Sequence, residues 1–179
     1  LAVKALTAMP FVDAKRIGLM GGSHGANVSS RLVSRLDVAG AVLCAPAAMD
    51  LIEIKRAATA GKEPVVKILT KLVGDMEKER GATAEEIAKN PAKYGYSSAM
   101  TEIEGVRCPI LVINGRNDDN SPPSIIAAYV GKLKQAGKQV ETYEPDNGPH
   151  GFYFGRPDIP ESKEAAKRAV AFFQERFAQ

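Results

Sequence analysis

The feature that most constrains the fold of this chain is the alternation of short apolar runs with segments of helical periodicity. Residues 17–20, 41–45 and 109–114 form such runs, and a fourth, more mixed run covers 139–143. Because glycine, proline or charged residues bound the runs after a few positions, each is typical of a buried strand. Strands that alternate with helices are joined by βαβ crossovers, so we predict an α/β fold with a mostly parallel sheet flanked by helices.

Helices are predicted between and beyond these strands, at 1–9, 24–36, 124–135 and 162–177. In the last three helices the apolar residues recur at intervals of three or four, which places them on one face. We expect these faces to be directed toward the sheet. Their residues are, in chain order, Val28, Leu32 and Leu36, then Ile126, Val130 and Leu133, and finally Ala166, Val170 and Phe173.

Residues 50–100 differ from the rest of the chain, because they carry many charges and contain no convincing strand. Helical patterns cover about 64–79 and 84–90, and Thr83 with Glu86 forms a capping box that begins the second of them. We therefore expect a helical insertion between two strands of the sheet. It is either an ordinary surface insertion or a small cap over the functional site, whose candidate contacts are then Met76, Tyr94, Tyr96 and Met100.

The composition argues against several classes of protein. The 24 basic and 21 acidic residues give a net charge of +3 and are evenly scattered, which argues against a nucleic-acid partner. No apolar stretch approaches the roughly 18–20 residues that cross a bilayer, and no signal segment is recognisable, so we expect a soluble chain without a membrane partner. Cys44 and Cys108 lack redox or metal-binding spacing, as do the acidic residues outside the loop at 115–122, so we predict no metal and no cofactor.

The first predicted strand runs into Gly21-Gly22-Ser23-His24-Gly25, and a helix is predicted to begin at once. In this G-x-S-x-G pattern the chain reverses sharply, and glycines two residues on either side of the serine let strand and helix approach. The Ser23 hydroxyl is then exposed at a helix N-terminus, as a nucleophile requires, and the backbone N–H of His24 is a candidate oxyanion donor. The alternative is a tight glycine turn in which Ser23 caps the helix.

A serine nucleophile requires a general base, and the chain has two histidines. His24 adjoins Ser23 on the turn, where we expect its ring to point away from the hydroxyl. His150, in the loop after the fourth strand, is therefore the candidate base. In the loop after the third strand, Asp118 is the candidate carboxylate partner of His150, and Asp119 is the alternative. A loop of this composition can also cap the next helix, and this is the competing interpretation. The order Ser, Asp, His is the one that α/β-hydrolases use.

On these motifs the sequence resembles the serine hydrolases of the α/β-hydrolase fold. Among them it is most similar to the catalytic domains of prolyl oligopeptidase-type peptidases and related carboxylesterases. Residues 13–25 look like their nucleophile strand and elbow, 109–118 are similar to their acid-bearing loop, and 150–152 match their histidine motif. Two small departures are Ala99, where the group often has proline, and Ala26, where many members have a further glycine.

The resemblance implies a sheet of about eight strands, of which four are recognisable here. We therefore expect residues 1–179 to be the C-terminal part of an α/β-hydrolase domain, with a helical cap insertion at 50–100. The early strands, and the loop that supplies the second oxyanion N–H, would come from an upstream part of the same protein or from a partner segment that completes the sheet.

The resemblance and the three residues together predict a serine hydrolase that cleaves small-molecule carboxylic esters through an acyl-enzyme. Two alternatives are a serine peptidase of the prolyl oligopeptidase or acylaminoacyl type and an inactive, hydrolase-like binding domain. Tyr96 and Phe152 are candidate walls of a substrate pocket. The competing interpretation for Phe152 and its neighbours Tyr153 and Phe154 is that they pack in the core.

Overall fold

The four predicted strands form a parallel sheet in the computed structural model, which describes residues 2–46, 50–61 and 67–178. The strands are β1 (Gly18–Gly22), β2 (Gly40–Cys44), β3 (Ile110–Ile113) and β4 (Val140–Tyr143). They lie in the order β1-β2-β3-β4, and each neighbouring pair is parallel. Because Gly22 pairs with Cys44, and Ile113 with both Cys44 and Tyr143, the carboxyl ends of all four strands meet at one edge.

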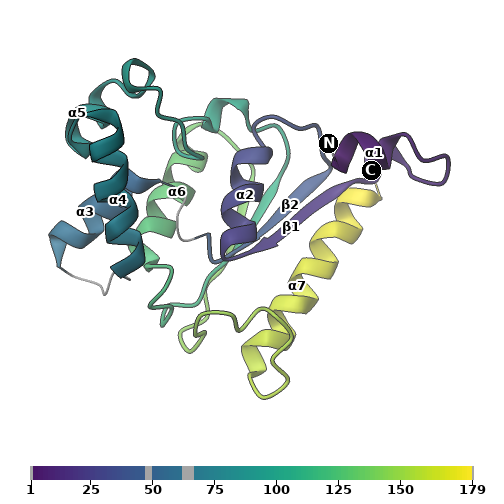
Figure 1. Ribbon diagram of the computed structural model, residues 1–179. Helices are drawn as coiled ribbons and strands as arrows, with labels where there is room; N and C mark the ends of the chain where they lie inside the picture. Colours follow the sequence, from purple (N-terminus) through teal and green to yellow (C-terminus); the bar gives the residue numbers. More distant parts are fainter. Residues whose placement is uncertain (1, 47–49, 62–66, 179) are drawn as a thin grey trace.

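Helices flank the sheet on both faces. The helices of the described residues are α1 (Ala2–Thr7), α2 (His24–Leu32), α3 (Leu51–Ala60), α4 (Lys67–Arg80), α5 (Ala84–Lys89), α6 (Pro123–Gln135) and α7 (Pro160–Phe177). Short 3₁₀ turns occur at η1 (Ala14–Arg16), η2 (Pro91–Tyr94) and η3 (Ile103–Gly105). Figure 1 shows α2 and α6 on one side of the sheet and α7 on the other, with α3, α4 and α5 grouped beyond α6. Within the described residues, no helix is both long and apolar enough to cross a bilayer.

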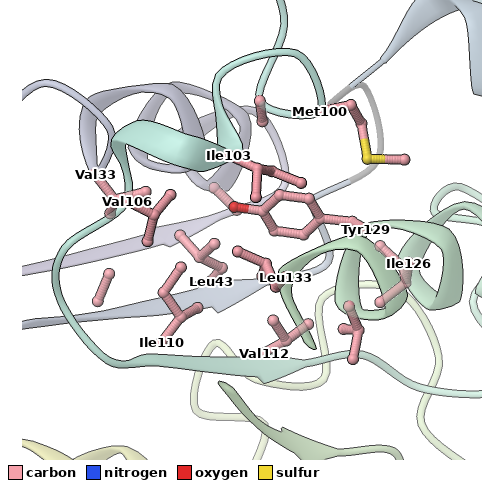
Figure 2. Packing of buried hydrophobic residues seen from close by; sticks show 14 of the residues in the cluster. Val33, Leu43, Met100, Ile103, Val106, Ile110, Val112, Ile126, Tyr129 and Leu133 are labelled. Atoms are coloured by element: carbon pink, nitrogen blue, oxygen red, sulfur yellow. The ribbon is translucent and has the colours of Figure 1, made fainter. Parts of the chain in front are cut away.

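The main core lies between the sheet and the helices α2 and α6, as Figure 2 shows. Side chains alternate along each strand, so Leu43 and Val112 point into this core, while Val42 and Leu111 point into a second core beneath α7. Both faces of the central strands are therefore covered, which explains why their sequences are apolar at consecutive positions. Leu133 of α6 is fully buried in the main core.

Two helices agree with the sequence pattern. The inward face predicted for α6 is confirmed, because Ile126, Val130 and Leu133 are all buried. The helix α1 lies within the predicted range 1–9, of which residue 1 is outside the described part of the chain, and none of its side chains is buried.

The inward face predicted for α2 is wrong. Val28 of that face is exposed, whereas Ala26, Ser29 and Ser30 are the buried residues of the helix. Ser30 satisfies its own hydroxyl by donating to the carbonyl of Asn27, 2.8 Å away, so a polar residue can lie on the buried face. The helix also ends at residue 32 and not at 36, so the last predicted apolar position is outside it.

The inward face predicted for α7 is also wrong. The buried residues of this helix are Ser162, Ala165, Ala169 and Phe172. Of the predicted face, Ala166 and Val170 are exposed and Phe173 is half-buried. The helix carries two adjacent apolar stripes of the same period, so periodicity alone does not decide which of them contacts the sheet.

The segment between β2 and β3 is helical, as predicted, but it contains one helix, α3, that the sequence pattern did not reveal. The first predicted helix corresponds to α4, although residues 64–66 lie outside the described part of the chain. The capping box of α5 is confirmed: Thr83 Oγ1 accepts from the backbone of Glu86, and the Glu86 carboxylate accepts from the backbone of Thr83. These three helices share a small core that also includes Ile125 of α6.

We predict that Leu133→Ala lowers the free energy of unfolding by about 2–5 kcal/mol, because it leaves a cavity in the main core. The matched control is Lys134→Ala on the same helix, whose exposed side chain should change that free energy by less than about 0.5 kcal/mol. Chemical denaturation followed by circular dichroism measures both. Equal stability of the two variants would contradict the packing of α6 described above.

Candidate active site

The side chains of Ser23, His150 and Asp118 form a hydrogen-bonded chain at the carboxyl edge of the sheet. His150 Nε2 lies 3.1 Å from Ser23 Oγ. His150 Nδ1 lies 3.0 and 2.9 Å from the two carboxylate oxygens of Asp118. The three residues stand in the loops after β1, β4 and β3, and they meet because parallel strands end at the same edge. The structure thus brings together the three residues that were predicted from the sequence to lie in one site.

Ser23 occupies a strained backbone conformation between β1 and α2. Its φ of 51° and ψ of −116° lie in a region that residues with a side chain rarely adopt. Two backbone hydrogen bonds hold the turn: the Ser23 N–H donates to the Cys44 carbonyl at 2.8 Å, and the Asn27 N–H donates to the Ser23 carbonyl at 3.1 Å. The Ser23 side chain makes no capping hydrogen bond, so the alternative role as a helix cap is not observed.

Gly21 allows β1 and α2 to approach each other at this turn. A Cβ atom on Gly21 would overlap the backbone of Gly25 and of Ala26, so any other residue would push the helix away. The prediction that Gly25 must also lack a side chain is wrong, because a Cβ there would meet no atom within 4 Å. Gly25 contributes to the contact only through its backbone.

His24 is the first residue of α2, and its backbone N–H therefore has no helical acceptor. An N–H group at the N-terminus of a helix favours negative charge, which is what an oxyanion requires. The exposed side chain of His24 lines a neighbouring cavity, whereas the Ser23 hydroxyl contacts His150. The two histidines thus lie in the separate positions that we expected.

The backbone of its own loop holds Asp118 in place. The side chain is fully buried, and its Oδ1 accepts from the N–H groups of Asn120 at 2.9 Å and Ser121 at 2.8 Å. These donors stabilise the carboxylate charge and fix its direction. Asp119, the alternative partner, is exposed, and the carboxylate that contacts His150 is that of Asp118.

The acid-bearing loop and the histidine loop touch at Gly115 and Gly148. A Cβ atom on Gly115 would overlap the backbone of Gly148, so the two loops can be this close only when glycine stands there. The Arg116 N–H also donates to the Pro145 carbonyl at 3.0 Å. The distance between Asp118 and His150 is therefore set by backbone contacts between the two loops.

The hydrogen bond with Asp118 raises the pKa of His150 above its ordinary value of about 6.5. Partial burial of the ring lowers this pKa, and the negative charges of Asp118 and Asp119 raise it further. The imidazolium that forms when His150 accepts a proton is therefore stabilised. Because only the neutral ring is a base, the raised pKa moves the acid limb of any reaction that needs it to higher pH.

A cavity of about 410 Å³ opens beside the Ser23 turn. Tyr96, one of the two predicted pocket residues, lines this cavity, and its hydroxyl accepts from the Leu51 N–H at 2.9 Å. The prediction for Phe152 is wrong, because Phe152 is fully buried in the core beneath α7. The competing interpretation, that this aromatic residue packs in the core, is the one observed.

The other candidate contacts of the cap lie away from this cavity. Met76 is buried in the core shared by α3, α4 and α5, and Tyr94 packs against the same core. Met100 is buried in the main core, where Figure 2 shows it near Tyr129. Of the four residues proposed from the sequence, Tyr96 is therefore the one that lines the cavity.

The cavity is also lined by Arg31 and Arg80. Neither arginine was predicted from the sequence to belong to the site. Arg31 could have been found, because His24, Asn27 and Arg31 recur at intervals of three and four and so share the face of α2 next to Ser23. Arg80 comes from the helical insertion, whose packing no local pattern determines.

Neither cysteine has the properties of a reactive thiol. Cys44 is buried in the core beneath α7 and Cys108 in the main core, and neither forms a disulfide. Burial raises the pKa of the Cys44 thiol to about 12 and that of Cys108 to about 11. Among residues 2–46, 50–61 and 67–178, no group of three or more His, Cys, Asp or Glu side chains is arranged to hold a metal ion.

The parallel sheet, the strained serine turn and the order of the three loops define an α/β-hydrolase fold. The sequence matches the prolyl oligopeptidase family over residues 1–179, and the chain belongs to this family of serine hydrolases. No curated protein matches the sequence closely enough to count as a relative.

Several solved structures share this fold at low sequence identity. The uncomplexed acylaminoacyl peptidase of Pyrococcus horikoshii is 20% identical with a TM-score of 0.73, over 97% of this chain and 26% of its own. Puromycin hydrolase is 17% identical with a TM-score of 0.75, over 99% of this chain and 24% of its own. Acetyl xylan esterase 1 from Thermoanaerobacterium sp. JW/SL YS485 is 19% identical with a TM-score of 0.69, over 98% of this chain and 50% of its own. This chain thus spans about a quarter of the first two proteins and half of the third.

We predict that the His150 ring titrates with a pKa above about 6.5. Asp119→Asn should lower this pKa slightly, because it removes a nearby negative charge, and Asp118→Asn should lower it more, because it removes the main cause of the shift. An NMR titration of the ring C–H resonances, assigned with a His150→Gln variant, measures these values. A His150 pKa that neither substitution changes would contradict the arrangement.

Gly115→Ala should lower the free energy of unfolding by roughly 1–3 kcal/mol or more, because the new methyl group forces the acid-bearing and histidine loops apart. The control is Gly131→Ala in α6, where a Cβ meets no atom within 4 Å; there we expect a gain of roughly 0.5–1 kcal/mol. Thermal unfolding measures both. If Gly115→Ala were as stable as Gly131→Ala, the loops would not be in contact.

Proposed function

We propose that this chain carries the catalytic residues of a serine hydrolase that cleaves carboxylic esters through an acyl-enzyme. The observation that carries the proposal is the continuous set of hydrogen bonds from Ser23 through His150 to Asp118, at 3.1 Å and 2.9 Å. Membership of a serine hydrolase family and the likeness to folds that include an acetyl xylan esterase are consistent with it.

In the proposed mechanism, Ser23 Oγ attacks the ester carbonyl carbon while His150 Nε2 takes the hydroxyl proton. The backbone N–H of His24 donates to the oxyanion of the tetrahedral intermediate. Asp118 accepts from Nδ1–H of His150, which fixes the tautomer and stabilises the imidazolium. His150 then gives its proton to the departing alcohol, leaving the acyl group on Ser23.

Deacylation repeats the same steps with water in place of serine. His150 removes a proton from the water molecule as its oxygen attacks the acyl carbon of the acyl-enzyme. The second tetrahedral intermediate collapses, Ser23 Oγ recovers the proton from His150, and the carboxylic acid departs. Each cycle thus consumes one water molecule and leaves the three side chains in their starting protonation states.

Peptide bond cleavage is the second candidate function, because the same residues can acylate from an amide. The family match and the fold shared with an acylaminoacyl peptidase and a puromycin hydrolase favour it as much as the esterase neighbour favours ester cleavage. An amide needs a protonated leaving nitrogen, and in this proposal His150, whose Nε2 lies 3.1 Å from Ser23 Oγ, supplies that proton. The third candidate, an inactive binding domain, is tested by the same assays.

We also propose that a further segment, upstream in the same protein or from a partner, pairs with β1 and supplies the second oxyanion donor. β1 is at the edge of the sheet described here, and the side chain of Met20 on it is 55% exposed. A groove of about 200 Å³ lined by Met20, Val170 and Phe173 runs between β1 and α7. Exposed apolar edges of this kind are usually covered by another strand or element.

We predict that the full-length protein hydrolyses short-chain p-nitrophenyl esters and that Ser23→Ala lowers kcat by at least about 10³-fold. Asp118→Asn should lower kcat by about 10⁴-fold, whereas the matched Asp119→Asn should stay within a few-fold of the unsubstituted protein. Undiminished turnover by Ser23→Ala would discard the mechanism. Parallel assays with an aminoacyl p-nitroanilide separate esterase from peptidase activity, and no turnover of either substrate would favour the inactive domain.

A further inference from the structure

The cavity beside Ser23 has walls of two kinds. Val28 and Leu72 contribute exposed apolar side chains, at 47% and 40% exposure, and Tyr96 contributes an aromatic ring. Arg31 of α2 and Arg80 of α4 contribute guanidinium groups. Because His24 is also part of the wall, the cavity begins one residue after the nucleophile, within reach of a substrate bound at Ser23.

Arg80 has no carboxylate partner among the described residues. Its Nη1 donates to the Tyr94 carbonyl at 3.2 Å, and its guanidinium lies 5.8 Å from the centre of the Tyr96 ring. The buried Nε of Arg80 has no hydrogen-bond partner there. A half-buried guanidinium held by a carbonyl and an aromatic face keeps its full positive charge at the cavity wall.

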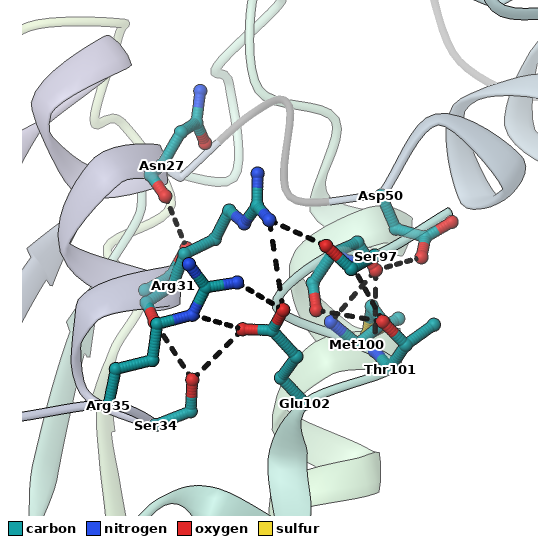
Figure 3. Close-up of polar contacts among 11 residues, drawn as sticks. Asn27, Arg31, Ser34, Arg35, Asp50, Ser97, Met100, Thr101 and Glu102 are labelled. Atoms are coloured by element: carbon teal, nitrogen blue, oxygen red, sulfur yellow. Dashed lines mark hydrogen bonds and ion pairs between the residues drawn. The ribbon is translucent and has the colours of Figure 1, made fainter. Parts of the chain in front are cut away.

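Arg31 is only partly neutralised. It lies 3.7 Å from a Glu102 oxygen and donates to Ser97 at 2.7 Å. The same carboxylate is held more closely by Arg35, at 2.5 and 3.1 Å, as Figure 3 shows. The Arg35 hydrogen bonds are also the main reason why the pKa of Glu102 is lowered. One carboxylate therefore serves two guanidinium groups, which leaves an excess of one positive charge.

The other carboxylate near the cavity is already engaged. Asp50 is buried, accepts from the Ser98 hydroxyl at 2.5 Å, and caps α3 through the N–H groups of Ile52 and Glu53. Figure 3 shows its carboxylate directed toward the segment that contains Ser97 and Thr101. Taken together, the three arginines Arg31, Arg35 and Arg80 and the two carboxylates Glu102 and Asp50 carry a net charge of +1, and the two arginines that line the cavity are Arg31 and Arg80.

We infer that this cavity binds a carboxylate group of the substrate, and that this group contacts Arg80 and Arg31. The enzyme then prefers ester substrates whose acyl chain is apolar and ends in a carboxylate. The inference rests on the proposed function, because it names the substrate class of the same site. A guanidinium fork matches the two oxygens of a carboxylate. The apolar residues that line the same cavity favour a hydrocarbon chain between the reacting carbonyl and the charge.

The test uses two 4-nitrophenyl esters of adipic acid that differ only at the far end, one with a free carboxylate and one with a methyl ester. Rates of the full-length protein are corrected for spontaneous hydrolysis. We expect kcat/KM for the free acid to exceed that for the methyl ester by about tenfold at low salt, with most of the difference in KM. The preference should decrease at high salt, because screening weakens the charge interaction.

Arg80→Gln should reduce this preference by about tenfold, and Arg80→Lys should reduce it less. The matched control is Lys78→Gln, which removes the same charge from an exposed position on α4 and should leave the preference unchanged. Thermal unfolding of each variant checks that it is folded. Equal kcat/KM for the two esters, or an Arg80→Gln variant that keeps the full preference, would overturn the inference.

A binding measurement separates this inference from the proposed function. In the Ser23→Ala protein, NMR chemical-shift titrations compare monomethyl adipate with dimethyl adipate. Tighter binding of the carboxylate, weakened by Arg80→Gln, would support the cavity assignment even if no ester were hydrolysed. Equal binding of the two compounds would reject it even if Ser23 proved to be the nucleophile.

Discussion

The strained turn at Ser23 is the constraint on which the rest of the site depends. A residue with a side chain held at a positive φ of this kind is unfavourable by roughly 1–3 kcal/mol, so the surrounding structure must hold it. The hydrogen bond to the Cys44 carbonyl fixes the entry into the turn, and the missing side chain of Gly21 lets α2 approach closely enough to fix the exit. The hydroxyl is then directed to the sheet edge, where His150 reaches it.

The other two residues are positioned by backbone contacts and not by long side-chain networks. The loops after β3 and β4 meet at Gly115 and Gly148, and the N–H groups of the first loop orient the Asp118 carboxylate. This arrangement places a buried negative charge against one nitrogen of His150 and leaves the other nitrogen for Ser23. The His150 ring is thereby held in one tautomer.

The strands and the meeting of Ser23, Asp118 and His150 could be predicted because each depends on a local pattern: continuous apolar runs, a glycine-flanked serine and loops at strand ends. The inward faces of α2 and α7 could not be predicted. In α2 a polar residue is buried, because the Ser30 hydroxyl is satisfied within its own helix. In α7 two apolar stripes have the same period, and either of them could contact the sheet. Phe152 stands two residues after His150, yet it is buried in the core beneath α7. The cavity and Arg80 depend on how the insertion packs, which only the folded chain determines.

The central claim is that Ser23 is a nucleophile activated by His150. Labelling of the full-length protein with a fluorophosphonate, followed by mass spectrometry of its peptides, tests this claim most directly, because the reagent forms a covalent bond with an activated serine. The account predicts one phosphonyl group on Ser23 and little or none in a His150→Ala variant. A protein that stays unlabelled at Ser23, or equal labelling with and without His150, would contradict it.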